Sequence, residues 1–189
     1  MLSEIKNCQR CSLRHNQAPL YDPTSKCDIM WVGLSAKRVS SPQESPLASN
    51  TSTGELIAEI ESNLRGLTFH KTNLVKCLPL DKTGKLRYPT KQEMHTCFPY
   101  LQAEIEICSP KLVVLLGKRV GEVAGKEFGL EFPGWEEFNY KPITYNGRAF
   151  LLVHHPSYIS VYKRREKDAY VKEIERLTRK IFGIYTREQ

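Results

Sequence analysis

Four of the six cysteines have the spacing of ligands to one metal centre. Cys8 and Cys11 form a C-x-x-C pair near the N-terminus, and Cys77 and Cys97 lie in two later segments. Four thiolates can complete the tetrahedral shell of a zinc ion or hold one iron–sulfur cluster. Buried core cysteines are also common, so Cys77 and Cys97 could equally be core residues. The spacing alone leaves these three interpretations open.

A second group of chemically useful residues lies where predicted strands end. The segments are Gly33-Leu34-Ser35, Asn73 and His154-His155-Pro156-Ser157. Parallel sheets bind ligands beyond the carboxyl ends of their strands, so these segments predict a ligand site. Asn73 and either histidine could instead have structural roles. Because neighbouring strand residues point to opposite sides, we expect only one histidine in the site, and the structural role fits His154 better.

Strands and helices alternate along the chain. Apolar runs predict strands over residues 29–34, 72–76, 111–117, 141–145 and 149–154. Helices are expected over residues 54–64, 90–108, 119–128 and 165–182, with Thr53 and Thr90 as N-caps. The pattern predicts one α/β/α domain over residues 1–189, with a central, mainly parallel sheet of about four strands. Cys27 and Cys108 flank apolar strands and are expected in its core.

The composition favours a polyanionic partner. The formal net charge is +7, and the basic run Lys163-Arg164-Arg165 closely follows the histidine motif. The sequence shows no signal peptide, lipidation motif or long apolar run. Six cysteines without a secretory signal indicate a reducing compartment, where thiols bind metal rather than pair. We therefore expect a cytoplasmic monomer that does not bind membranes.

The order of these motifs resembles that of the iron–sulfur uracil-DNA glycosylases, families 4 and 5 of their superfamily. The resemblance extends from Cys8 to about Arg165. The matching segments are Cys8-Gln9-Arg10-Cys11-Ser12-Leu13, Ile29-Met30-Trp31-Val32-Gly33, Thr72-Asn73-Leu74-Val75-Lys76-Cys77-Leu78-Pro79, Cys97-Phe98-Pro99-Tyr100-Leu101, Pro110-Lys111-Leu112-Val113-Val114-Leu115-Leu116-Gly117 and His155-Pro156-Ser157. The resemblance implies an α/β/α fold that acts on DNA.

The resemblance also assigns roles to individual residues. Cys8, Cys11, Cys77 and Cys97 would hold a structural 4Fe-4S cluster. Asn73 would read a base flipped out of the DNA, because its side-chain amide can address N3 and O4 of a pyrimidine. His155 would donate a hydrogen bond to O2 of the departing base and stabilise the charge that develops there.

Residues 157–165 would form a loop that enters the minor groove of DNA. Ile159, Val161 and Tyr162 are candidate wedges between bases. The alternative is an ordinary solvated basic loop. The expected contacts to DNA come from Lys37, Ser157, Tyr158, Lys163, Arg164 and Arg165.

The motif after the first strand departs from both families. Family 4 has Gly-Glu-Ala-Pro-Gly there, with an acidic residue implicated in handling water, and family 5 has Gly-Leu-Ala-Pro-Ala. This chain has Gly33-Leu34-Ser35-Ala36-Lys37, without carboxylate or proline. Leu47 stands where family 4 has a phenylalanine that stacks on the base. These changes predict a wider pocket for the base, lined by Gly33, Leu34, Leu47, Asn50 and Asn73.

Without that carboxylate, two mechanisms are open. Ser35, Asn50 or a backbone amide could orient the attacking water. Alternatively, Lys37 could attack the sugar as a nucleophile and cut the strand as a lyase, although phosphate binding is the commoner role of such a lysine.

The sequence therefore predicts a DNA glycosylase. It would hydrolyse the N-glycosidic bond of a flipped-out uracil or other altered pyrimidine and leave an abasic site. One alternative is a glycosylase for a bulky modified cytosine of phage DNA, which would make the protein a defence enzyme. Two further alternatives are a catalytically inactive iron–sulfur DNA-binding module and a zinc-stabilised nucleic-acid binder.

Overall fold

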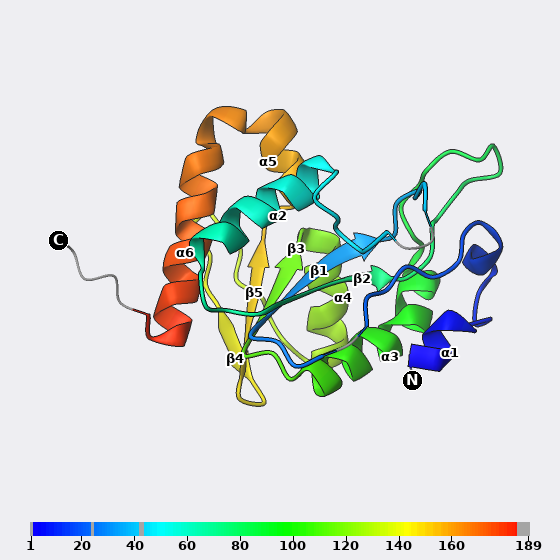
Figure 1. Ribbon diagram of the computed structural model, residues 1–189, viewed down its shortest axis with the longest axis horizontal. Helices are drawn as coiled ribbons and strands as arrows, with labels where there is room; N and C mark the ends of the chain where they lie inside the picture. Colours follow the sequence, from blue (N-terminus) through cyan, green and yellow to red (C-terminus); the bar gives the residue numbers. More distant parts are fainter. Residues whose placement is uncertain (1, 24, 42–43, 185–189) are drawn as a thin grey trace.

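A five-stranded sheet forms the centre of the computed structural model, which describes residues 2–23, 25–41 and 44–184 (Figure 1). The strands are β1 (Ile29–Ser35), β2 (Phe69–Val75), β3 (Leu112–Leu116), β4 (Ile143–Tyr145) and β5 (Arg148–Val153). The helices are α1 (Leu2–Lys6), α2 (Ser52–Asn63), α3 (Lys91–Cys108), α4 (Lys118–Phe128), α5 (Pro156–Tyr162) and α6 (Lys167–Phe182), with 3-10 turns at Ser12–His15 and Arg164–Glu166.

The strand order is β2-β1-β3-β5-β4. The first four of these strands are parallel, as the alternation of strands and helices predicts. β4 adds an antiparallel edge, and the turn before β5 has positive φ at Asn146 (47°) and Gly147 (74°), which suits a tight hairpin. The mainly parallel α/β/α fold is therefore confirmed.

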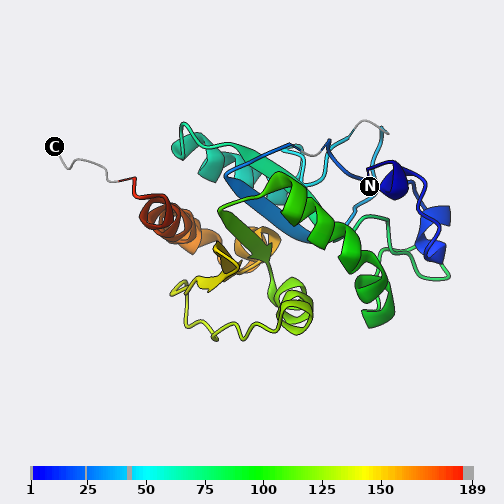
Figure 2. The ribbon, with the colours of Figure 1, turned by 90° about the horizontal axis from the view of Figure 1, so that it is seen from below.

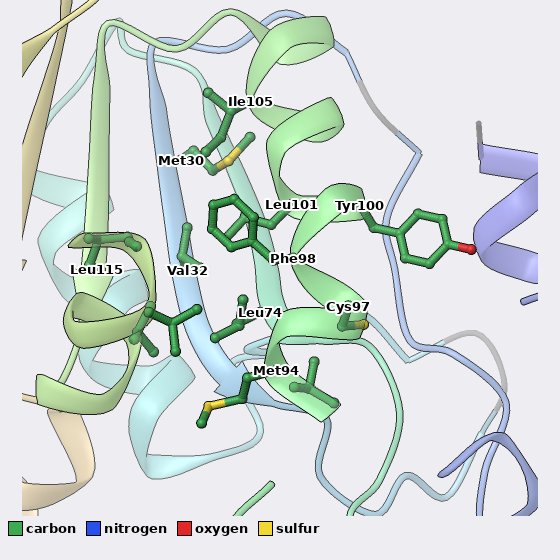
Figure 3. Close-up of a cluster of buried hydrophobic side chains, with 14 of the residues drawn as sticks. Met30, Val32, Leu74, Met94, Cys97, Phe98, Tyr100, Leu101, Ile105 and Leu115 are labelled. Atoms are coloured by element: carbon green, nitrogen blue, oxygen red, sulfur yellow. The ribbon is translucent and has the colours of Figure 1, made fainter. Parts of the chain in front are cut away.

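Helices cover both faces of the sheet. Successive residues of β1 point to opposite faces, so Met30 and Val32 pack against α3 and α4, whereas Ile29 and Trp31 pack against α2 and α6. Figure 3 shows the first of these two cores, in which Phe98, Leu101 and Ile105 of α3 point toward the sheet. All four β1 residues are buried, which places β1 at the centre of the molecule.

Capping residues fix where two of the helices begin. Thr90 and Glu93 form a capping box at the start of α3, as predicted for Thr90. α2 begins two residues earlier than predicted, because Thr51 and not Thr53 is its N-cap and accepts a hydrogen bond from the Gly54 amide at 3.0 Å. A Cβ at Gly54 would overlap the carbonyl of Ala48, so α2 packs closely on the loop before it.

The segment 157–165 is not the loop that we expected. Pro156 occupies the first turn of α5, and the Nδ1 atom of His155 accepts a hydrogen bond from the Ser157 amide at 3.2 Å. A proline in the first turn suits a helix start, because its missing N–H is not needed there. Ile159 is fully buried in α5, so it cannot be a wedge between bases.

The N-terminal segment lies beside the start of α3 in both views (Figures 1 and 2). Cys27 and Cys108 are both buried, as expected for core residues. Among the described residues, no helix has the length and apolar character needed to cross a membrane.

Candidate active site

A cavity of about 520 Å³ opens at the carboxyl ends of β1 and β2. This base pocket, as we call it below, is lined by residues from the strand ends, the loop before α2, the β2–α3 loop and α5. Its lining includes seven residues predicted from the sequence, which are Leu34, Ser35, Lys37, Leu47, Asn73, His155 and Ser157. Thr51, Thr53 and Arg87 add further polar groups.

Asn73 is buried against β1 with its amide oxygen unsatisfied. The parallel register pairs Asn73 with Gly33. A Cβ at Gly33 would overlap Oδ1 of Asn73 and lie 3.0 Å from Cδ2 of Leu47, so only glycine leaves room for this side chain. Oδ1 of Asn73 has no hydrogen-bond donor among the described residues, although the side chain is buried. An unsatisfied buried acceptor that lines a cavity is suited to bind a ligand donor.

A buried ion pair fixes the backbone of Asn73 from behind. Nζ of Lys76 donates to the carbonyl of Asn73 at 2.7 Å, to Oγ1 of Thr72 at 2.6 Å and to Oε2 of Glu104 at 2.5 Å. Lys76 is 1 % exposed and Glu104 is 0 % exposed. A buried charge costs free energy unless it is paired and hydrogen-bonded, and here Lys76 and one of the two oxygens of Glu104 are paired and hydrogen-bonded. The pair ties β2 to α3 directly behind the base pocket.

His155 presents one specific ring nitrogen as a donor. Its Nδ1 lies 3.2 Å from the Ser157 amide, which can only donate, so Nδ1 is the acceptor and the neutral ring carries its proton on Nε2. Burial lowers the pKa of His155, because the charged ring loses solvation. The pocket therefore holds a neutral histidine with an N–H donor.

His154 lies in a different environment from its neighbour and does not line the base pocket. Nε1 of Trp135 donates to its Nε2 at 2.8 Å, and the hydroxyl of Tyr140 lies 2.6 Å from its Nδ1. Its ring stacks on Tyr158 with the centroids 5.5 Å apart. Both ring nitrogens are used in these contacts, so the structure gives His154 a packing role.

Lys37 at the edge of the base pocket is paired with a carboxylate that we did not predict. Nζ of Lys37 forms an ion pair with Oε1 of Glu44 and lies 3.2 Å from Oδ1 of Asn50. The hydrogen bond from Lys37 lowers the pKa of Glu44. Nδ2 of Asn50 lies 3.3 Å from the same carboxylate, so Asn50 holds this pair rather than lining the pocket. An ammonium held by a carboxylate has no lone pair with which to attack a sugar.

The four predicted cysteine ligands line one small cavity. Cys8, Cys11, Cys77 and Cys97 all contribute to it, beside Tyr100. Figure 3 shows Cys97 and Tyr100 pointing away from the sheet, toward the N-terminal segment. The Lys76 amide donates to the sulfur of Cys97 at 3.4 Å. Burial and the neighbouring thiols raise the pKa of Cys77 to about 12. The N-terminal C-x-x-C pair therefore meets β2 and α3 at one place.

The geometry of this cysteine cavity bears on the kind of centre that it fits. In the part of the chain that the structure describes, no group of three Cys, His, Asp or Glu side chains could hold a metal ion. A zinc ion needs all its sulfur ligands within about 2.3 Å of a single point. An iron–sulfur cubane binds each thiolate through a different iron, so its ligands stand farther apart. Four thiols around one cavity are the donor set that either kind of centre uses.

Apart from Lys37, the residues expected to contact DNA lie on and after α5. Ser157 and Tyr158 line a second hollow of about 400 Å³, which shares walls with the base pocket. Lys163 forms an ion pair with Glu166 at 2.8 Å, whereas Arg164 and Arg165 are exposed. Of the expected wedges, Val161 and Tyr162 are exposed.

A model of the uracil DNA glycosylase superfamily matches residues 19–178 of this sequence. The chain belongs to this superfamily. It is 27% identical over 161 residues to the type-4 uracil-DNA glycosylase of Saccharolobus solfataricus, covering 82% of this chain and 71% of the relative. It is 28% identical to the type-4 enzyme of Thermotoga maritima, covering 82% of this chain and 79% of the relative.

A solved structure supports the fold independently. The crystal structure of wild-type Pedobacter heparinus SMUG2 aligns with a TM-score of 0.54 at 12% identity, over 86% of this chain and 79% of that one. At this identity the match concerns the fold alone. The match therefore supports the α/β architecture of the chain.

Four charged residues in or near the base pocket were not predicted from the sequence, namely Glu44, Lys76, Arg87 and Glu104. Glu104 shares the buried face of α3 with Cys97, Leu101 and Cys108, so helical spacing could have placed it in the core. No comparable local signal exists for Glu44, because its contact with Lys37 depends on the path of the loop.

Proposed function

We propose that this protein is a DNA glycosylase that hydrolyses the N-glycosidic bond of a flipped-out uracil and leaves an abasic site. The observation that supports this most strongly is the pairing of two side chains in one cavity of a superfamily member. Asn73 offers an unsatisfied amide oxygen, and His155 offers an N–H donor from a neutral ring. Both line the base pocket.

Asn73 would select the base. Uracil carries an N3–H donor and an O4 acceptor, which complement the oxygen and the NH2 group of an amide. Cytosine presents an acceptor at N3 and an amino group at position 4, so it would leave the buried amide of Asn73 mispaired. A site built on hydrogen bonds rejects such an analogue strongly, because the buried polar groups lose their partners.

His155 would stabilise the leaving base. Breaking the glycosidic bond leaves negative charge on the pyrimidine, part of it at O2. The Nε2–H of a neutral histidine can donate to that oxygen as its charge develops. Because the half-buried His155 ring is held at Nδ1 by Ser157, it is oriented before the substrate binds.

Ser35 is the best placed of the proposed water-orienting groups. It lines the base pocket, whereas the side chain of Asn50 is engaged by Lys37 and Glu44. The same ion pair argues against Lys37 as a nucleophile. Borohydride should therefore trap no covalent adduct between the protein and substrate DNA, and a trapped adduct lost in Lys37→Ala would support the lyase mechanism instead.

We also propose that Cys8, Cys11, Cys77 and Cys97 hold a 4Fe-4S cluster. The cluster would supply a rigid cross-link and no reacting atom. Its ligands would join the N-terminal segment to the end of β2 and to α3. DNA would be the macromolecular partner, and the enzyme would act as a monomer in the cytoplasm. Size-exclusion chromatography with light scattering tests the monomer.

A panel of duplex and single-stranded oligonucleotides, each with one altered base, tests the activity. We expect base release and alkali-sensitive sites with uracil, and their loss in Asn73→Ala. Asn139→Ala, which changes an exposed asparagine outside the pocket, is the matched control. No abasic product from any base would overturn the proposal and favour the inactive DNA-binding module.

A larger modified pyrimidine is a second candidate substrate; a bulky modified cytosine of phage DNA would bind only with the Asn73 amide rotated, so that its NH2 group faces N3. Two observations favour it: the cavity measures about 520 Å³, and aliphatic Leu47 lines it where family 4 has an aromatic ring. The same panel decides between the two. Release confined to uracil would exclude the wider specificity and, with it, a role in phage defence.

A further inference from the structure

The exposed large apolar side chains are concentrated around the base pocket. Of the six such side chains among the described residues, five line the base pocket or the second hollow beside α5. They are Leu86, Tyr88, Tyr158, Val161 and Tyr162, with exposures of 65%, 65%, 40%, 67% and 75%. Apolar groups gathered on a surface in this way mark an interaction site.

These five side chains come from two separate elements. Tyr158, Val161 and Tyr162 belong to α5, where contacts with DNA were expected. Leu86 and Tyr88 belong to the β2–α3 loop (residues 76–90), in which the sequence assigned a role only to Cys77. Leu86 lines the base pocket, and Tyr88 lines both hollows. The apolar side chains that line the two hollows therefore include two from the β2–α3 loop, in addition to those of α5.

The β2–α3 loop is held in place by internal contacts. Leu80 and Leu86 form an antiparallel bridge. The guanidinium of Arg87 donates to the carbonyl of Leu80 at 2.9 Å and binds both carboxylate oxygens of Glu93 at 2.6 and 2.8 Å. Arg87 also donates to the carbonyl of Tyr88 at 2.9 Å. A loop ordered before binding loses little entropy when a ligand docks.

Basic groups accompany these two side chains of the β2–α3 loop. The guanidinium of Arg119 lies 4.2 Å from the centroid of the Tyr88 ring, which fixes the ring from one side. Lys82 and Lys85 of the same loop are exposed, as is Lys118 beside Arg119. An aromatic ring with one face held by arginine and positive charge around it suits a nucleobase on its other face and a phosphate backbone alongside.

We propose that Tyr88 and Leu86 form a stacking platform for a nucleobase next to the flipped-out nucleotide. The inference rests on the proposed function, because it assumes that DNA enters the base pocket. The ligand is the DNA strand that carries the target base. The base of this strand that faces the β2–α3 loop would be unstacked from its neighbours. The platform would let the enzyme bind this strand in the absence of a complementary strand. Single-stranded DNA should therefore bind with high affinity.

Fluorescence anisotropy with a labelled single-stranded oligonucleotide that lacks any altered base tests this platform. We expect Tyr88→Ala to weaken binding about tenfold, the effect of losing one stacked base. Tyr88→Phe should bind like wild type, because it keeps the ring. Leu86→Ala should weaken binding by a smaller factor. Ile107→Ala, which removes an exposed apolar side chain near the other end of α3, should have no effect.

Two results would overturn the platform. One is wild-type affinity in Tyr88→Ala, and the other is an equal loss in Tyr88→Ala and Ile107→Ala. Thermal unfolding of each variant checks that the fold is kept. Because the oligonucleotide carries no substrate base, a failure of the proposed glycosylase activity would leave this measurement unaffected. In a second single-stranded oligonucleotide that carries uracil, a 2-aminopurine next to the uracil should lose fluorescence on binding to wild type. It should keep its fluorescence with Tyr88→Ala.

Discussion

The cysteine cavity and the base pocket both use the end of β2, yet they are built in different ways. The cysteine cavity is small, and its four candidate ligands are one side-chain type from three segments. The base pocket is open, and aliphatic, hydroxyl, amide and charged side chains from several loops line it. A site that only braces the chain can be built from repeated identical groups, whereas a site that recognises a molecule needs different groups placed separately.

Lys76 belongs to both regions. Its amide donates to the sulfur of Cys97 at 3.4 Å, and its Nζ donates to the carbonyl of Asn73 at 2.7 Å. The cysteine cavity and Asn73 are thus joined through one residue. Variants in each region test how far the two can be separated, beginning with the largest expected effect.

Cys77→Ser should affect stability most. If the cysteine cavity is a brace, loss of this ligand should remove the visible absorbance of the purified protein and destabilise the fold by about 4 kcal/mol or more. Cys27→Ser, at a buried cysteine outside the cavity, should keep the absorbance. Absorbance spectra and urea unfolding measure both. A Cys77→Ser protein with unchanged stability would contradict the role of a brace.

Lys76→Met should affect both regions. It leaves Glu104 buried without its partner, which typically costs about 3–5 kcal/mol of stability. The double variant Lys76→Met/Glu104→Leu removes both charges and should recover most of this loss. The double variant should still react slowly, because the Asn73 carbonyl lacks its donor. Full recovery of kcat in the stable double variant would show that Lys76 only stabilises the fold.

His155→Ala should affect only the base pocket. We expect a fall in kcat of about 10²–10³-fold, as is typical for removing one donor to a developing charge, with little change in KM. His154→Ala should instead lower thermal stability, because His154 bonds to Trp135 and Tyr140. Single-turnover kinetics on uracil DNA and thermal unfolding separate the two. Equal rate losses in the two variants would contradict the distinction between the neighbouring histidines.

The pH dependence should show the smallest effect. Burial lowers the pKa of His155, so the neutral ring persists in the folded state below its ordinary pKa of about 6.5. The rate should stay flat as the pH falls from about 8 to 6.5 and drop only at lower pH. Burial also lowers the pKa of His70 and His154 in the folded protein. Below about pH 6.5 these histidines therefore bind protons more readily in the unfolded chain than in the folded protein. Stability should therefore decrease as the pH falls below about 6.5. A rate that halves at about pH 7 would contradict a lowered pKa in His155.

Much of the fold could be predicted from the sequence because its signals are local. Buried strands such as Leu112–Leu116 are continuous apolar runs, and the Thr90 cap marks the start of α3. Each strand-end motif could also be recognised within its own segment. The motifs then meet in the fold because parallel strands place their carboxyl ends at one edge of the sheet. This is why Asn73 and His155 could be expected to meet although 82 residues separate them along the chain.

Contacts between loops could not be predicted in this way. The pairing of Glu44 with Lys37 depends on how the chain turns back before α2, and no periodicity encodes that path. Ile159 was expected in a loop, but the N-cap at His155 and Pro156 converts the segment into a helix that buries it. The same holds for Tyr88, whose position beside Arg119 results from two elements that meet only in the folded protein.

Gly33 makes the alignment of β1 and β2 essential for the site. It lies opposite Asn73 in the ladder, and there is no room at that place for a Cβ. A shift of the ladder by one residue would put Val32 or Leu34 beneath the asparagine and displace its amide. Base release would then cease even in a chain with normal helix and strand content. Catalytic turnover is therefore a sensitive report on whether the two strands have paired correctly during folding.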